Sequence, residues 1–132
     1  MGGKPVETIK LNNGIVVEVW DHSRVLAGDR WLVSLEARAD IPLDMAQLSA
    51  LKDKDKEKAL QALKKAYGDR IPYRYRQEKH FVDQRERHKV FQEFLDLLKS
   101  NVLPYLSHKE FASKLVLAKV RELKRKDPRL FF

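Results

Sequence analysis

Residues 6–20 read VETIKLNNGIVVEVW, and this stretch decides the fold class that we expect. Two runs rich in β-branched residues, 6–11 and 15–20, flank Asn12, Asn13 and Gly14. These residue types tolerate the positive φ that a tight hairpin turn requires. The stretch therefore predicts an antiparallel β-hairpin.

A third strand is predicted over residues 31–40, WLVSLEARAD, which alternate with period two. We expect one face of this strand in the core and the other in water. The core face consists of Trp31, Val33, Leu35, Ala37 and Ala39, and the wet face of Leu32, Ser34, Glu36, Arg38 and Asp40. Gly28 and Asp29 supply the turn before the strand, and such short connections favour antiparallel pairing of all three strands.

Helical spacing replaces the strand pattern after Pro42 and continues to Gly68, a plausible C-cap, with a break near Lys52. Residues 72–82 return to an alternating pattern and predict a fourth strand. Two further helices follow. The first begins at Asp83, with Glu86 three residues on, and runs to a corner at residues 103–105.

The last helix is predicted to begin at a capping box formed by Ser107 and Glu110, and Pro128 ends it. The order of elements is β-β-β-α-β-α-α. It predicts an α+β fold with a four-stranded antiparallel sheet and helices packed on one face. The residues expected to form one core are Trp31, Val33, Leu35, Phe91, Phe94, Leu98, Val116 and Val120.

Length and composition narrow the class of protein. A chain of 132 residues is expected to form a single domain over residues 1–132, and its 43% hydrophobic and 35% charged content excludes a disordered or low-complexity protein. The absence of Cys excludes disulfides, thiolate nucleophiles and zinc fingers. No apolar run approaches the length of a bilayer span and no signal-peptide pattern opens the chain, so we expect a cytoplasmic protein without a membrane partner.

The positive charge is concentrated near the C-terminus. The formal net charge is +8, and the last nineteen residues contain seven basic and only two acidic side chains. On a helical projection Lys114, Arg121 and Arg125 form a narrow stripe, with Lys124 and Arg129 nearby. The opposite side of this helix carries Ala112, Val116, Val120 and Leu123. Such a surface suits the phosphates of RNA or DNA, although a merely solvated helix face has the same composition.

Basic and aromatic residues also interleave between Arg70 and Phe81, and these include Arg74 and Arg76. Surfaces that stack bases and bind phosphates have this composition. In a strand, however, the arginines point away from Tyr73 and Tyr75. The alternative is that the tyrosines contact the helices while the arginines pair across the sheet with Glu18, Glu36 or Glu78.

Catalytic and metal signals are weak. The four histidines lack a standard ligand spacing, and Asp21, His22 and Ser23 are adjacent in sequence, which rarely produces the geometry of a catalytic triad. Four carboxylates, Asp40, Asp44, Asp69 and Asp83, have no spacing that predicts convergence. We therefore expect no catalytic residue, no cofactor and no metal.

The chain ends in the apolar residues Leu130, Phe131 and Phe132, which would form a sticky patch in water. The tail is expected either to fold back onto its own core or to dock on a partner subunit. Three functions remain open. The first is a small non-catalytic domain that binds nucleic acid through phosphate contacts, and the alternative is an interaction module with an acidic protein partner or a second copy of itself. The third, an enzyme based on carboxylates, has the weakest support among the residues.

Overall fold

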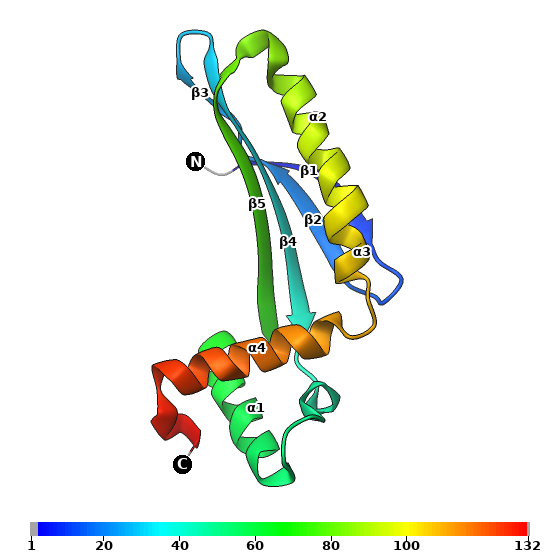
Figure 1. The fold of residues 1–132 in the computed structure, drawn as a ribbon, viewed down its shortest axis with the longest axis vertical. Helices are drawn as coiled ribbons and strands as arrows, with labels where there is room; N and C mark the ends of the chain where they lie inside the picture. The colour runs from blue at the N-terminus through cyan, green and yellow to red at the C-terminus, as the bar shows by residue number, and fades with distance from the viewer. Residues whose placement is uncertain (1–2, 132) are drawn as a thin grey trace. The chain divides into compact units, whose positions relative to one another are not determined.

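The computed structural model describes residues 3–131, and their side chains up to Arg129. It has an α+β fold with an antiparallel sheet, which confirms the predicted fold class (Figure 1). The chain divides into two compact units. The first unit comprises residues 1–39 and 73–107, and the second comprises residues 40–72 and 108–132. The expectation of a single domain stays a prediction.

The sheet has five strands where four were predicted. They are β1 (Lys4–Lys10), β2 (Val16–Asp21), β3 (Arg24–Ala27), β4 (Arg30–Pro42) and β5 (Arg70–Asp83). The order is β1-β2-β4-β3, and β5 also pairs with β4. Strand β4 is therefore the centre of the sheet.

The additional strand β3 continues the path of β2. Asp21 of β2 faces Leu35 of β4, and three residues later Arg24 of β3 faces Leu32, so the register is unbroken. The N–H of His22 donates to the carbonyl of Ser34 at 2.9 Å across the gap between the two strands. Strand β3 has four residues and none is buried, so the alternation that indicates a strand is too short to detect there.

The predicted hairpin turn is confirmed. Gly14 has a φ of +88°, which favours glycine, and its N–H donates to the carbonyl of Leu11 at 3.0 Å. The side chain of Asn13 accepts a hydrogen bond of 3.1 Å from the N–H of Ile15. Its amide also donates to the carbonyl of Leu106 at 2.9 Å, which ties the turn to a helix of the first unit.

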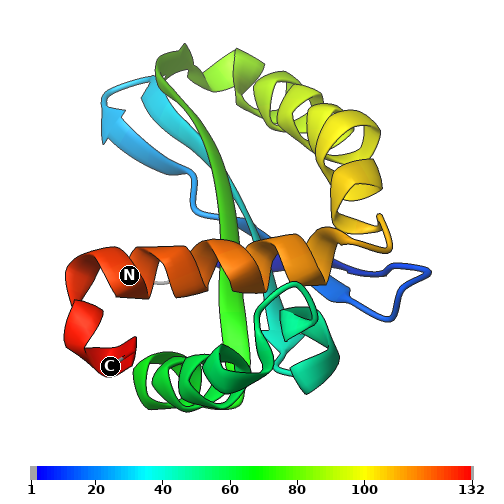
Figure 2. The same ribbon diagram turned by 60° about the horizontal axis from the view of Figure 1, so that its bottom comes forward.

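Helices cover one face of the sheet in the first unit, as both ribbon views show (Figures 1 and 2). They are the 3₁₀ turn η2 (Gln84–Glu86), α2 (Arg87–Leu97), the π-helical segment η3 (Leu98–Val102) and α3 (Leu103–Leu106). Of the predicted core residues, Val33, Leu35, Phe94 and Leu98 are buried in this unit. Trp31 and Phe91 are only half-buried.

The predicted corner at residues 103–105 is not the end of the helical path, which continues to Leu106. Pro104 lies in the first turn of α3. Proline lacks an N–H and its ring would clash with the preceding turn of an α-helix. The wider π turn of η3 lies directly before it, and such a turn is a usual way to accommodate this break.

The second unit contains the remaining helices. They are the 3₁₀ turn η1 (Met45–Leu48), α1 (Asp53–Tyr67), α4 (Phe111–Lys126) and the 3₁₀ turn η4 (Pro128–Phe131). The break near Lys52 is thus confirmed, as is the cap at Gly68, whose φ is +82°. Helix α4 packs on η1 and α1, so the buried Val116 and Val120 lie in this unit and not with the six other predicted core residues.

The start of α4 was predicted wrongly. The helix begins at Phe111, and Glu110 is its N-cap without a side-chain cap. Ser107 instead donates its hydroxyl to the carbonyl of Pro104 at 3.0 Å, because α3 ends next to it. A capping box lies instead at η1, where Asp44 accepts from the N–H of Ala46 and Gln47 accepts from the N–H of Asp44.

The side chains of Leu130 and Phe131, and Phe132 as a whole, lie outside the described part of the chain, so the expected burial or docking of the tail stays a prediction. Across residues 3–131 no helix combines the length and the apolar character that crossing a bilayer requires.

Candidate nucleic-acid interface

The candidate interface is built on α4, whose sequence gives it one apolar side. Phe111, Val116 and Val120 are buried. Lys124, Arg125 and Lys126 occupy the last turn, where cations interact favourably with the negative end of the helix dipole. That effect explains basic residues in the last turn, but it does not extend to Lys114 or Arg121, which lie further back along the helix.

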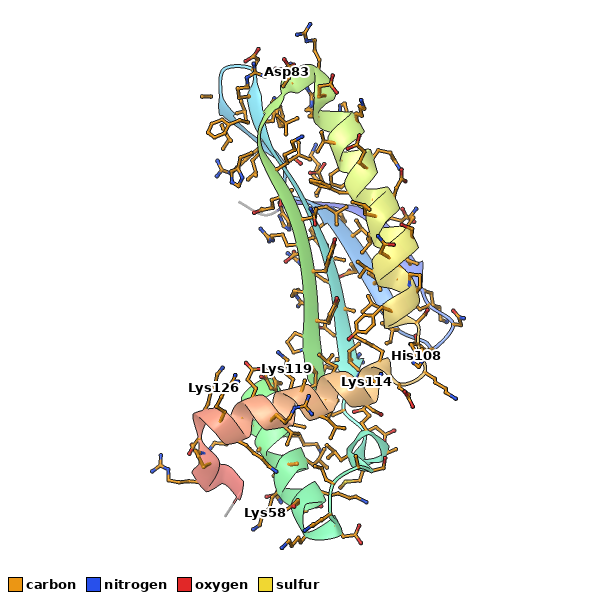
Figure 3. The ribbon with its side chains drawn as sticks, in the orientation of Figure 1. Lys58, Asp83, His108, Lys114, Lys119 and Lys126 are labelled. Carbon is orange, nitrogen blue, oxygen red and sulfur yellow. The ribbon has the colours of Figure 1, made fainter. Side chains whose placement is uncertain are left out.

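The predicted stripe of Lys114, Arg121 and Arg125 is exposed along α4. Figure 3 labels Lys114 near the start of this helix and Lys126 near its end. The ammonium of Lys114 lies 3.8 Å from the carboxylate of Glu110, a solvated pair one turn away. Among the residues that the structure describes, no acidic side chain pairs with Arg121 or Arg125.

The flank of the stripe is partly neutralised. The ammonium groups of Lys119 and Lys126 lie 3.5 and 3.3 Å from the carboxylate of Glu122. The hydrogen bond from Lys126 and the charge of Lys119 hold the pKa of Glu122 below its usual value, so this carboxylate stays ionised at neutral pH. Arg129 pairs with Asp127 at 3.3 Å, and Lys124 is half-buried. The excess positive charge of α4 therefore centres on the stripe.

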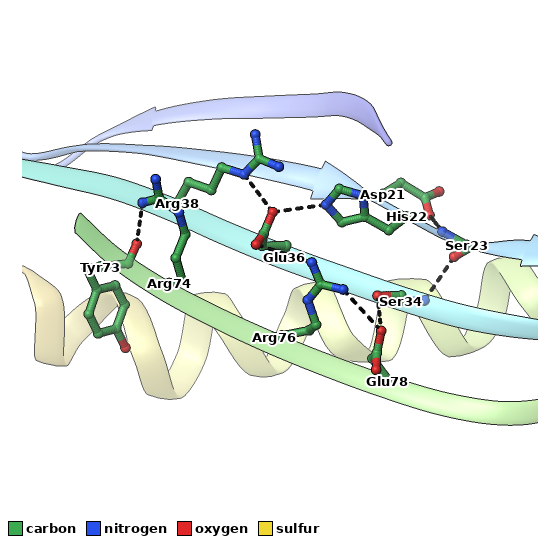
Figure 4. A network of polar contacts seen from close by, with 10 residues as sticks. All are labelled: Asp21, His22, Ser23, Ser34, Glu36, Arg38, Tyr73, Arg74, Arg76 and Glu78. Carbon is green, nitrogen blue, oxygen red and sulfur yellow. Dashed lines mark hydrogen bonds and ion pairs between the residues drawn. The ribbon is translucent and has the colours of Figure 1, made fainter. Parts of the chain in front are cut away.

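The strand residues Arg74 and Arg76 belong to a different environment, in the first unit. Arg76 forms ion pairs with Glu36 at 3.3 Å and with Glu78 at 3.4 Å (Figure 4). One guanidinium nitrogen of Arg74 donates to the carbonyl of Tyr73 at 2.9 Å and to that of Ala39 at 3.3 Å. The alternative interpretation predicted that the arginines of this strand pair with acidic residues across the sheet. It is confirmed for Arg76.

Glu36 is the centre of these contacts and is buried, although its face of β4 was expected in water. It accepts from His22 at 2.9 Å and from Arg38 at 2.6 Å, besides Arg76. Burial alone raises the pKa of Glu36, but these hydrogen bonds and the charge of Arg38 outweigh it and lower the pKa to about 2. The exposure of this face was predicted from the polarity of its residues. Polar side chains can nevertheless be buried when they form hydrogen bonds with one another.

Ser34, beside Glu36 on the same face, is fully buried. Its hydroxyl donates to Glu78 at 2.7 Å, which lowers the pKa of that carboxyl, and its N–H donates to the hydroxyl of Ser23 at 3.0 Å. Arg38 also lies over the ring of Trp20, 4.4 Å from its centroid. These contacts form a cross-strand network that stabilises the sheet.

Asp21, His22 and Ser23 are adjacent in sequence, but the side chains of Asp21 and His22 have separate hydrogen-bond partners. Asp21 accepts from the N–H of Ser23 at 2.8 Å, and His22 bonds to Glu36 instead of to either neighbour. In the part of the chain that is described, no group of three His, Asp or Glu side chains has a geometry suited to a metal ion. Asp44 and Asp83 cap η1 and η2, which gives these two carboxylates structural roles.

The environment of the two tryptophans was not predicted. Trp20 stacks on His22 with 6.4 Å between the ring centroids, and Arg87 of α2 lies 4.7 Å from the centroid of Trp31. Trp20 and His22 are two residues apart in sequence, so their contact is local, whereas the contact of Arg87 with Trp31 depends on the packing of α2 against β4.

Comparison with protein-family models, curated proteins and solved structures gives no match.

Proposed function

We propose that this chain is a small non-catalytic binding domain that holds nucleic acid by its phosphates through the basic side of α4. Lys114, Arg121 and Arg125 make the primary contacts, and Lys124 and Arg129 lie beside them. The observation that carries the proposal is the exposure of Arg121 and Arg125 without an acidic partner among the described residues. The cytoplasmic location expected from the sequence belongs to the same proposal.

The chemistry of the stripe favours phosphates over bases. Lysines and arginines spaced along one helix supply charge at intervals, and phosphate contacts carry no sequence information directly. A base-reading surface would need paired donors and acceptors at defined positions. Binding is therefore expected to be nearly independent of nucleotide sequence. Arg76 takes part only if its ion pairs with Glu36 and Glu78 open, so the strand contributes less than the helix.

The test measures fluorescence anisotropy of labelled single-stranded and double-stranded RNA and DNA over a salt series. The decisive variant changes Lys114, Arg121 and Arg125 to Glu. Because each phosphate neutralised contributes about 0.7 to 0.9 to the slope of log affinity against log salt, this variant should lose binding and salt dependence together.

A matched control is available on α1, where Lys54, Lys58 and Lys65 are also exposed. These lysines are spaced by four and then seven residues, the reverse of the seven and four in the stripe. Changing all three to Glu alters the net charge by the same amount. The control should bind nearly as wild type does. Equal affinity of wild type and the α4 variant, equal losses in both variants, or no binding by wild type at low salt would each overturn the proposal. The interaction module would then be the better interpretation.

A further inference from the structure

The first unit contains a pocket of about 520 Å³ where β2 gives way to β3. We call it the strand-end pocket. The sheet contributes Lys4, Arg24 and Trp31 to its wall, and the first two turns of α2 contribute Arg87 and Phe91. Its volume is in the range of sites that bind small organic molecules, about 300 to 1,000 Å³.

The pocket carries uncompensated positive charge. Lys4, Arg24 and Arg87 come from three different elements, and among the described residues none of them pairs with an acidic side chain. Among the described residues of the wall, Asp21 supplies the one carboxylate, and it accepts a hydrogen bond from the N–H of Ser23 at 2.8 Å. Two other arginines of the same sheet, Arg38 and Arg76, do have an acidic partner, because both form ion pairs with Glu36.

Aromatic rings line the same space. The guanidinium of Arg87 lies 4.7 Å from the ring centroid of Trp31 and donates to the carbonyl of Gln84 at 3.0 Å, so its position is fixed from two sides. The indole N–H of Trp31 is buried without an acceptor among the described residues. Phe91 adds a second ring from the helix.

The geometry points to a binding site for a small aromatic phosphate, the class to which nucleoside monophosphates belong. The phosphate meets Lys4, Arg24 and Arg87, and the flat ring lies against Trp31 and Phe91. Three cations are more than a ligand with one carboxylate would require. The guanidinium group of arginine can donate two parallel hydrogen bonds to the oxygens of a phosphate. This inference concerns the first unit and does not depend on the proposed role of α4.

The test titrates the full chain with four probes in low salt by isothermal calorimetry. They are adenosine monophosphate, adenosine, inorganic phosphate and indole-3-acetate, an aromatic carboxylate. Adenosine monophosphate should bind with a Kd of about 1 mM or tighter, and the other three probes at least about tenfold more weakly, because each lacks the phosphate or the ring. A Trp20→Phe variant leaves Trp31 as the single indole, whose N–H resonance should shift on binding.

The variants change exposed cations, so that folding is preserved. Lys4→Glu with Arg24→Glu should weaken adenosine monophosphate at least about tenfold. The matched control changes Lys10, at the other end of β1, and Lys79 of β5, both exposed and outside the pocket wall. The control should bind as wild type does.

Several results would overturn the inference. They are the absence of binding by adenosine monophosphate, equal affinity of the pocket variant and wild type, and equal losses in the pocket variant and its control. If inorganic phosphate binds as tightly as adenosine monophosphate, Trp31 and Phe91 do not contribute to binding. Tighter binding of indole-3-acetate would remove the phosphate assignment.

Discussion

The imidazole Nε2 of His22 lies 2.9 Å from the carboxylate of Glu36 and donates a hydrogen bond to it. The direction follows from charge. The pKa of Glu36 is about 2, so the carboxyl is ionised at neutral pH and only accepts. Glu36 thereby holds together His22, which lies between β2 and β3, Arg38 of β4 and Arg76 of β5.

The first prediction concerns acid stability. Because the pKa of Glu36 is lower in the folded chain than its ordinary value of 4.5, its contribution is present above about pH 4.5 and is lost as the pH falls towards 2. The contribution is at most about 3 kcal/mol. Glu36→Gln should lower the free energy of unfolding at pH 7 and flatten its dependence on pH between 4.5 and 2. Urea denaturation across this range measures both effects.

The exposed Glu93 of α2 provides the control for this prediction. Glu93→Gln should change the free energy of unfolding by less than about 0.5 kcal/mol. If Glu36→Gln behaves in the same way, the hydrogen bonds to Glu36 contribute nothing to stability and the account of the network is wrong.

A second prediction tests the core of the first unit. Phe94 is 7% exposed and Phe81 is 72% exposed, so the same truncation should have different costs. Phe94→Ala should lower the free energy of unfolding by about 3 to 5 kcal/mol, because it removes buried surface and leaves a cavity. Phe81→Ala should cost less than about 1 kcal/mol. Similar losses for both variants would show that α2 does not bury the side of the helix assigned to it.

A third prediction concerns the backbone at Phe81, which has a φ of +59° near the end of β5. This conformation places a Cβ in a crowded position, and glycine avoids the clash. Phe81→Gly should therefore be more stable than Phe81→Ala by about 1 kcal/mol, even though glycine has the more flexible unfolded chain. Thermal denaturation of the two variants measures the difference. A more stable alanine variant would contradict a left-handed backbone at this position.

A fourth prediction compares two helix starts. Asp44 accepts the N–H of Ala46 at 2.9 Å, so Asp44→Ala should cost about 1 kcal/mol. Ser107 does not cap α4, and Ser107→Ala should cost less than about 0.5 kcal/mol. Chemical denaturation distinguishes the two positions. The opposite ranking would place the capping box where the sequence pattern predicts it, at Ser107 and Glu110.

Local signals in the sequence predicted most of the secondary structure. The turn at Gly14 and the cap at Gly68 require a positive φ that glycine adopts without strain, so they are visible in the residue type alone. The exposed stripe of Lys114, Arg121 and Arg125 followed from helical spacing, because the period of an α-helix determines which residues share a side. Each of these features depends on residues within a few positions of one another.

Tertiary structure decided what depends on distant partners. Strand β3 pairs Arg24 with Leu32 in the register of β2, and its own four residues are too few to show an alternating pattern in the sequence. The buried Glu36 accepts one of its hydrogen bonds from Arg76, which is forty residues away in sequence. The strand-end pocket joins the start of β1 to α2 in the same way. Polarity and period describe a residue and its near neighbours, whereas burial and charge pairing depend on which distant segment folds against it.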